Sequence, residues 1–281
     1  MTAFCGIYGY EITRPLVGPG FRIEPRTTDY QQSSLWAREE SAYHLTAVLS
    51  GPSVTDDFLF DLEAVLSFIE HLDVIVTSPR SVETEDVFSA FEPIITTHRR
   101  SSGGGAALPS DVFFHNTRTD FVVACLGKLS DEAYCTATKF RALFFKKVET
   151  FRQRRPFLEV SYFFLYSGLE TYARAVLNDR NSRNSSEPIC ALLQRFGFDV
   201  SVERPNDLPR AVSTYTHLRN SLFHNSELDK SINLNGTTVD ITVIDYFFHL
   251  SQLVTLVVFK AVEFDDGHIN WNSWIDRQPF K

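Results

Sequence analysis

Apolar residues in the second half of the chain recur at alternating spacings of three and four, the period of an amphipathic helix. Two long stripes predict a helix over about 150–178 and a last helix within 241–264. Their members are Leu158, Tyr162, Leu165, Leu169, Tyr172 and Val176, and then Val243, Phe247, Leu250, Val254, Val257 and Ala261. Shorter helices are expected over about 186–197 and 207–228. Four helices joined by modest loops predict an antiparallel four-helix bundle.

Proline and glycine mark where these helices begin, bend or end. Pro156 either starts the helix over 150–178 or kinks it, and Gly197 ends the next helix. The Asn-Gly pair in NLNGTT, residues 233–238, predicts a turn between the third and last helices.

The first half of the chain has a different pattern, in which short β-branched and aromatic runs alternate with turn residues. These runs predict strands, at 4–12, 44–50, 72–78, 111–115 and 120–127. One helix is expected over 57–71, capped within Thr55-Asp56-Asp57, and SSGGGAALP (101–109) is expected to be a flexible surface loop. The fold class is therefore α+β, with a mixed, strand-containing domain over 1–138 and an all-α domain over 139–281.

Charge is unevenly divided between these two domains. The chain carries a net −8, but residues 1–138 hold 9 Lys and Arg against 19 Asp and Glu, whereas the rest is slightly basic. The run KFRALFFKKVETFRQRR, residues 139–155, has seven basic residues and one Glu. Such a run either attracts phosphates or is a solvated helix face. Its candidate RNA-binding residues are Lys146, Lys147, Arg152, Arg154 and Arg155.

The cysteines, the N-terminal sequence and the most apolar stretch limit the kinds of site and the cellular location that we expect. The four cysteines, Cys5, Cys125, Cys135 and Cys190, show no C-x-x-C pair and no metal-ligand spacing, so reduced thiols and no metal site or cofactor are expected. The N-terminus has no readable secretory signal. Polar residues interrupt the apolar stretch 241–264, which predicts a core helix rather than a membrane span. A cytoplasmic location without membrane attachment is expected.

The third helix carries an unusual polar cluster, HLRNSLFHNSEL, at residues 217–228. Its apolar stripe is Ala211, Tyr215, Leu218 and Leu222, and its second stripe is polar and is made of His217, Asn220, Ser221 and His224. Asn220 and His224 are four apart and can touch. Arg219 lies one position to the side of this polar stripe. Its long side chain can place the planar guanidinium over the His224 imidazole and still bind an anion.

Arg219, Asn220 and His224, within RNSLFH on a late helix of a bundle, resemble the motif of the HEPN family. The resemblance covers about 140–281 and extends to none of 1–138. It implies a metal-independent endoribonuclease of a toxin, CRISPR or antiphage system, built as a homodimer whose motif helices face each other. Glu170 matches the polar residue that many members carry on the first bundle helix.

The bare pattern is weak, since Arg38 with His44 and Arg210 with His217 have comparable spacing. Purely structural roles for His224 and Glu170 also remain open. His224 can be a helix-end histidine favoured by the helix dipole, and Glu170 can form an ordinary ion pair with Arg174 four residues later.

The resemblance implies a specific reaction. Arg219 would bind the phosphate, His224 would transfer protons and Asn220 would orient either of them, while Glu170 would assist and His217 and Ser221 would contact RNA. Attack by the 2′-hydroxyl would leave a 2′,3′-cyclic phosphate and a 5′-hydroxyl. Expected partners are single-stranded RNA or tRNA, a second copy of the chain, and an unidentified activator or antitoxin. The alternatives are a non-catalytic HEPN module that binds RNA, a nucleotide or a protein, and a plain adaptor.

Overall fold

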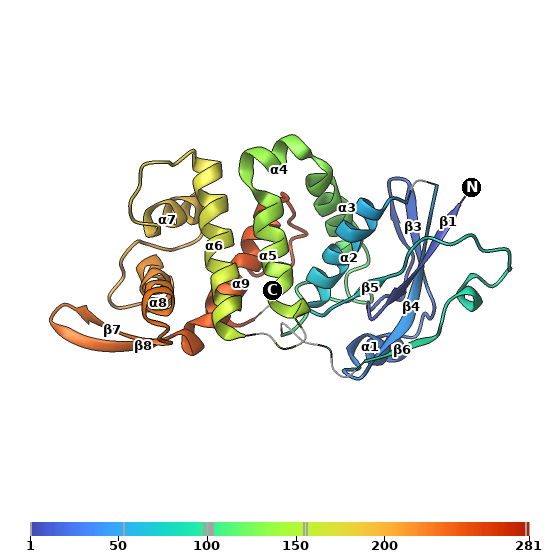
Figure 1. Cartoon of the computed structure of the whole chain (residues 1–281), viewed down its shortest axis with the longest axis horizontal. Helices are drawn as coiled ribbons and strands as arrows, with labels where there is room; N and C mark the ends of the chain where they lie inside the picture. Colours follow the sequence, from blue (N-terminus) through green and yellow to red (C-terminus); the bar gives the residue numbers. More distant parts are fainter. Residues whose placement is uncertain are drawn as a thin grey trace. The chain divides into compact units, whose positions relative to one another are not determined.

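The computed structural model describes residues 2–52, 54–97, 100, 104–153, 155, 157–278 and 280 (Figure 1). The chain forms two compact units, one of residues 1–130 with 151–155 and the other of 131–150 with 156–281. The mixed α+β class is confirmed. The boundary falls at 130/131, so residues 131–138 belong to the second unit and not to the first.

An antiparallel sheet forms the framework of the first unit. Its strands are β1 (Ala3–Tyr8), β2 (Leu16–Gly18), β3 (Phe21–Pro25), β4 (Ala42–Gly51), β5 (Ile75–Val76) and β6 (Ile94–Thr96). The order is β2-β3-β4-β1-β5, and β6 pairs with the start of β4. The central strand β4 is the longest and nearly all of its residues are buried, as expected for a strand with neighbours on both edges.

The helices of the first unit are α1 (Tyr30–Arg38), α2 (Asp56–Glu70), the short 3-10 helix η1 (Val87–Ala90) and α3 (Thr117–Ser130). The predicted cap of α2 is confirmed, because the Thr55 side chain accepts a hydrogen bond from the Phe58 N–H. Helices α2 and α3 pack against each other beside the sheet (Figure 1).

Two strand predictions for the first unit are wrong, and the surface-loop prediction is wrong in part. Residues 120–127 belong to α3 and not to a strand, and 111–115 form turns. The β-branched valines of 120–127 favoured a strand, but Phe121, Val122, Cys125 and Leu129 are buried at helical spacing. Within 101–109, residues 101–103 lie outside the described residues, 104 and 105 are exposed as expected for a surface loop, and 107–109 are buried.

A buried ion-pair network ties α2 and α3 to the segment that follows β1. The Arg118 guanidinium contacts Glu70 Oε1 at 2.6 Å and donates a hydrogen bond to the Glu11 carbonyl. The side chains of Arg118 and Glu70 are almost fully buried. Burial raises the pKa of the Glu70 carboxyl, while the neighbouring Arg118 charge opposes that rise. Removing either partner would leave an uncompensated buried charge.

The second unit is mostly helical. Its elements are α4 (Glu132–Thr138), α5 (Phe140–Arg152), α6 (Leu158–Leu177), α7 (Ser186–Arg195), the 3-10 helix η2 (Leu208–Arg210), α8 (Val212–Asn225), β7 (Asp229–Leu234), β8 (Thr237–Thr242), α9 (Val243–Ala261) and α10 (Ser273–Asp276). The last two residues of α5, Phe151 and Arg152, are grouped with the first unit. Helices lie in all four predicted regions, and α6 packs against α7, α8 and α9.

Two helix predictions for this unit are wrong. The single helix expected over 150–178 is divided, because α5 ends at Arg152 and α6 begins at Leu158; Pro156 itself lies outside the described residues. The unit is also not all-α. The turn at 233–238 is present, with Asn235 and Gly236 both at positive φ, but it joins the strands of the hairpin β7–β8.

The apolar stripes account for the packing of the second unit. Tyr162, Leu165, Leu169 and Tyr172 of α6 and Leu250, Val254 and Val257 of α9 are all buried. Helix α9 is also long and apolar enough, by length and composition alone, to cross a membrane. Half of that segment is buried inside the fold, and a core helix has the same composition.

Lys147 lies inside the second unit, although the sequence placed it on a basic face. Its side chain is buried, and its Nζ donates a hydrogen bond to Ser251 Oγ of α9 at 2.7 Å. Burial lowers the pKa of Lys147 from about 10.5 to about 7, because the charged form loses its hydration.

We predict that Lys147→Met stabilises the protein at pH 6–7 and that the gain shrinks towards pH 9.5. Between the folded and unfolded pKa values, the unfolded chain binds a proton that the folded chain does not, so wild-type stability rises with pH. Urea unfolding across this pH range measures the difference, with the half-exposed Lys230→Met as control. A constant difference between variant and wild type would contradict the prediction.

Candidate functional site

Helix α8 carries the motif, and its apolar side anchors it. Ala211, Tyr215, Leu218 and Leu222 are buried, as the spacing predicts. The Tyr162 hydroxyl of α6 donates to the Tyr215 carbonyl at 3.0 Å, which holds the two helices together. The opposite side of α8 therefore faces outward.

Arg219 is held by its neighbours on that outward side. Its Nη1 donates a hydrogen bond to Asn220 Oδ1 at 2.8 Å. The guanidinium also lies over the Tyr166 ring, 5.7 Å from its centroid, and over the Phe223 ring at 5.5 Å. No carboxylate of the described residues pairs with Arg219, so the remaining N–H groups of its fork can bind an anion.

His224 is exposed in the last turn of α8 and stands apart from the Arg219–Asn220 pair. The structure has no hydrogen bond between Asn220 and His224, and Arg219 lies over aromatic rings instead of the imidazole. The two contacts of His224 that the spacing allows are thus not formed. Its ring remains accessible to a substrate.

Beneath Arg219, buried hydroxyl groups join three elements. The Tyr166 hydroxyl lies 2.6 Å from Ser185 Oγ and 2.7 Å from Thr216 Oγ1, and Ser186 Oγ is 2.6 Å from the same threonine. Burial raises the pKa of Tyr166, so the phenol is neutral at physiological pH. Two tyrosines four residues apart in a core stripe, at 162 and 166, were the available sequence signal, since buried tyrosine hydroxyls need partners.

Glu170 lies one turn after Tyr166 on α6. Arg174 Nε donates a hydrogen bond to its Oε1 at 3.0 Å, so the ordinary i,i+4 pair is confirmed. Glu170 has no hydrogen bond to Arg219 or His224, but its charge acts on the nearby Tyr166 phenol and raises the pKa of that group.

His217 and Ser221 differ in exposure. His217 is exposed, as expected for a surface contact. Ser221 is buried, and its Oγ donates to the Asp229 carbonyl at 2.9 Å, which attaches β7 to α8. Its assignment as an RNA-contacting residue is wrong, because the hairpin covers that edge of the polar stripe.

The basic run 139–155 does not form one continuous face. Besides the buried Lys147, Arg152 forms ion pairs with Glu63 and with Asp73, the latter at 3.0 Å. Arg155 is exposed, and Arg154 lies outside the described residues.

Lys146 is the member of this run that lies near the motif. Its Nζ donates to Ser167 Oγ at 2.9 Å and sits 5.8 Å from the Phe163 ring centroid. Phe163 in turn packs on Phe223 with centroids 4.6 Å apart. Lys146 and Arg219 thus flank one aromatic pair.

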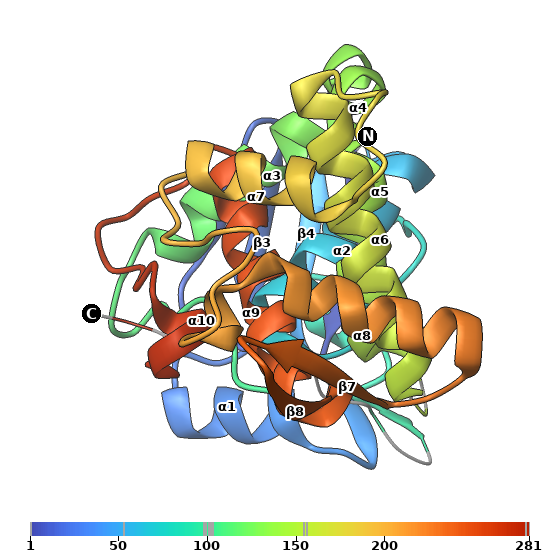
Figure 2. The same ribbon diagram turned by 90° about the vertical axis from the view of Figure 1, so that its left-hand side faces the viewer.

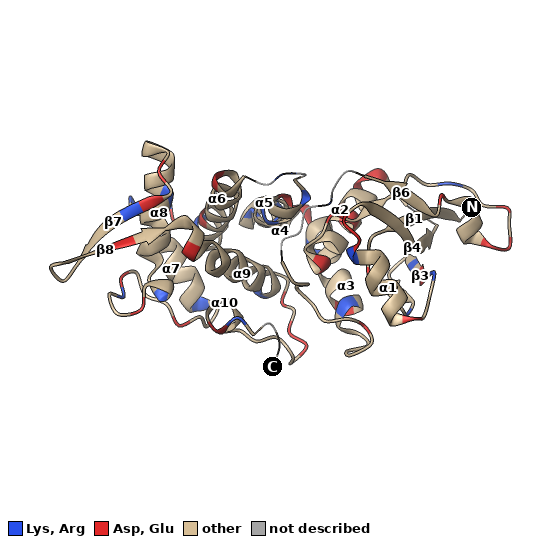
Figure 3. Cartoon of the chain, turned by 90° about the horizontal axis from the view of Figure 1, so that it is seen from below, with Lys and Arg blue, Asp and Glu red and all other residues tan. Residues whose placement is uncertain are grey.

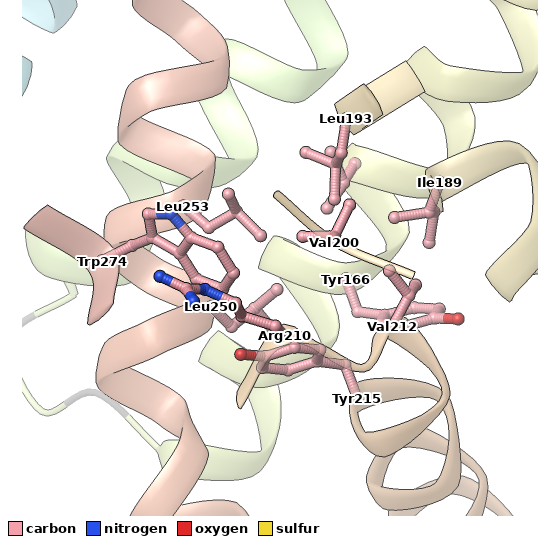
Figure 4. A pocket seen from close by; sticks show the side chains of 11 residues that line it. Tyr166, Ile189, Leu193, Val200, Arg210, Val212, Tyr215, Leu250, Leu253 and Trp274 are labelled. Atoms are coloured by element: carbon pink, nitrogen blue, oxygen red, sulfur yellow. The ribbon is translucent and has the colours of Figure 1, made fainter. Parts of the chain in front are cut away.

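A small apolar pocket lies between α6, α7, α8, α9 and α10 (Figure 4). Its volume is about 10 Å³. That is room for about one water molecule, so it is too small to bind a ligand. Within the described residues, no group of three His, Cys, Asp or Glu side chains is placed to hold a metal ion.

Comparisons with known proteins found no matching family model, no matching curated protein and no matching solved structure.

We predict that Tyr166→Phe destabilises the protein by about 1–3 kcal/mol, because it leaves the buried Ser185 hydroxyl without its partner and removes one of the contacts of Thr216. The ring beneath Arg219 is retained, so any function of Arg219 should survive under conditions where the variant is folded. Denaturant unfolding gives the loss, and Tyr30→Phe at an exposed tyrosine is the control. Equal stability of Tyr166→Phe and wild type would show that the network contributes nothing.

Proposed function

We propose that the protein is a metal-independent endoribonuclease of the HEPN type. The observation that carries the proposal is the Arg219 fork, fixed by Asn220 and two aromatic rings on the same helix as an accessible His224. A planar cation and an imidazole are the two groups that RNA cleavage through its own 2′-hydroxyl needs.

In this mechanism Arg219 binds the scissile phosphate and stabilises the charge that develops on it. His224 takes the proton from the 2′-hydroxyl or gives one to the leaving 5′-oxygen, since an imidazole can both accept and donate protons in water at neutral pH. Asn220 acts as a positioning residue, because its Oδ1 accepts the hydrogen bond that aims Arg219. Glu170 would act through Tyr166, because the charges of both Glu170 and Arg219 act on the Tyr166 phenol.

Helix geometry favours a homodimer. Arg219 and His224 are five residues apart, which separates their Cα atoms by about 7.5 Å along α8 and by about 140° around it. One helix therefore does not readily enclose a phosphate between the two side chains. A two-fold axis that brings two copies of α8 together would place His224 of one copy near Arg219 of the other.

An apolar surface beside the motif supports this assembly. Phe223 is 46% exposed, and Phe157 and Val160 at the start of α6 are 66% and 39% exposed. Phe223 contacts Phe163 of α6, so α6 and α8 contribute to a shared apolar patch. Exposed patches of this kind are typical of protein interfaces.

The proposal extends, on the HEPN resemblance, to a cytoplasmic role in antiphage defence or a toxin system acting on single-stranded RNA or tRNA. The acidic first unit would sense a signal or restrain the nuclease, in response to an activator or antitoxin. Basic residues that remain accessible, Lys146 and Arg155, would contribute phosphate contacts.

The second candidate is a non-catalytic HEPN module that binds RNA, a nucleotide or a protein. The observation that favours it is that His224 stands apart from the Arg219–Asn220 pair. That pair can bind an anion without a proton-transfer group beside it. Such a module would retain RNA without cutting it.

We predict that His224→Ala leaves the protein folded and lowers RNA cleavage by about 10²-fold or more, the usual contribution of an acid–base group. Arg219→Lys should also lower cleavage strongly, because it keeps the charge but loses the planar fork that Asn220 aims. Cleavage of total RNA and tRNA in EDTA by purified full-length protein measures both effects.

His115→Ala, in the first unit, is the matched control for His224→Ala. If His224 serves only as a helix-end residue, activity would follow the loss of folded protein, which would be about 1–2 kcal/mol at most. Wild-type cleavage by folded His224→Ala would remove the nuclease assignment and leave the binding module.

We also predict that Phe223→Asp converts the full-length dimer to a monomer and abolishes cleavage, because it places a charge in the apolar patch. Light scattering at micromolar concentration measures the mass. Leu35→Asp, at a still more exposed apolar residue of the first unit, is the control and should remain dimeric. A wild-type protein that is monomeric and still cuts RNA would contradict the dimer.

A further inference from the structure

A groove of about 250 Å³ runs beside the first half of α8. Its floor includes Ser213, Thr214 and His217 of α8, and its walls are the 203–208 loop and β7 of the hairpin, which lies alongside α8 (Figure 2). The groove belongs wholly to the second unit.

The groove continues the face that carries the motif. Ser213, His217, Asn220 and His224 follow one another at spacings of four, three and four, so they lie on one side of α8. His217 lies in the groove, and Asn220 is one turn further, about 5 Å along the helix. An extended ligand that passes Arg219 and Asn220 therefore reaches the groove with its next unit.

The register of β7 makes the groove a fixed feature. The hydrogen bond from Ser221 Oγ to the Asp229 carbonyl places the start of β7 beside the second half of α8. From there β7 runs back along the helix, which brings residues 230–234 beside Ser213 and His217.

Two side chains that line the groove, those of Lys230 and His217, are available to donate hydrogen bonds to a ligand. The side chains of Lys230 and His217 form no ion pair or hydrogen bond within the described residues, whereas the nearby Arg204 is engaged by Asp199 and Asp207. Both signs of charge occur on the hairpin, so the field is local to Lys230 rather than a broad basic surface (Figure 3).

The other residues that line the groove suit a planar organic group with polar atoms at its edge. Pro205, Leu208, Ile232 and Leu234 supply apolar surface from both walls. The Thr214 hydroxyl is buried at the floor and has no hydrogen-bond partner among the described residues. Apolar walls with a few polar groups are typical of sites for small organic groups.

Size restricts the occupant further. The volume is slightly below the range of about 300–1,000 Å³ for drug-sized ligands, which suits one nucleoside and excludes a duplex. A base can enter such a groove only when it is unstacked and unpaired, as in single-stranded RNA.

We propose that this groove binds the nucleotide next to the scissile phosphate, with its base between the apolar walls and its phosphate near Lys230. The inference rests on the proposed function and specifies its substrate as single-stranded RNA. It also gives His217 a role, as a donor to the bound nucleotide and not as a catalytic residue.

The test uses full-length protein and a single-stranded RNA oligonucleotide, with binding followed by fluorescence anisotropy in the His224→Ala background. Ser213→Trp, which fills the groove, should weaken binding at least tenfold. Lys230→Ala should weaken it severalfold and reduce the salt slope by about 0.7, the loss of one phosphate contact on a single strand. Arg14→Ala, an exposed arginine of the first unit, removes the same charge as a control and should change neither value.

The outcomes separate the groove from the nuclease site. If wild type cuts no RNA but Ser213→Trp and Lys230→Ala weaken binding as stated, the proposed function fails and the nucleotide groove stands. If both variants bind and cut RNA as the parent proteins do, the groove inference is overturned while the nuclease remains. Should Ser213→Trp fail to fold, unchanged affinity of Lys230→Ala alone overturns the inference.

Discussion

The hydroxyl of Tyr166 is the contact on which the geometry of the candidate site depends. It is buried where α6, the start of α7 and α8 meet, and its partners are Ser185 and Thr216. A buried hydroxyl without a partner costs about 1–3 kcal/mol, so these three elements are held in one arrangement. The ring of the same tyrosine lies under Arg219, which couples the packing of the core to the position of the cation.

Helix α8 divides into two halves with different surroundings. Its first half lines the groove beside β7, and its second half carries the partly exposed Arg219 and Asn220 and the exposed His224. The contact of Ser221 with β7, also in the second half, attaches the hairpin to the helix. The groove, the Arg219–Asn220 pair and the exposed His224 thus follow one another along α8, and a single RNA strand running along the helix would meet them in that order.

The sequence predicted those features that depend on a helical period. The buried residues Tyr215, Leu218 and Leu222 followed directly from their spacing, and so did the exposure of His217 and His224. Thr55 was identified as a cap because a cap is a local interaction.

Features that depend on contacts between distant segments could not be predicted in this way. Ser221 has the spacing of the polar stripe, but β7 covers it. Lys147 belongs to a basic run in the sequence, but in the fold it is buried against α9. The hydroxyl network and the groove each join three segments, so no single stretch of sequence carries their signal. Val122 favoured a strand, but tertiary burial made that segment a helix.

The most direct test of the nuclease assignment is the chemistry of the cut RNA ends. Purified full-length protein would be incubated in EDTA with a single-stranded RNA, and with the same RNA carrying 2′-O-methyl groups, and the fragments would be analysed by mass spectrometry. The account predicts fragments ending in a 2′,3′-cyclic phosphate and a 5′-hydroxyl, and no cut at a methylated position. Intact RNA, fragments with 5′-phosphates, or cleavage of the methylated RNA would contradict it.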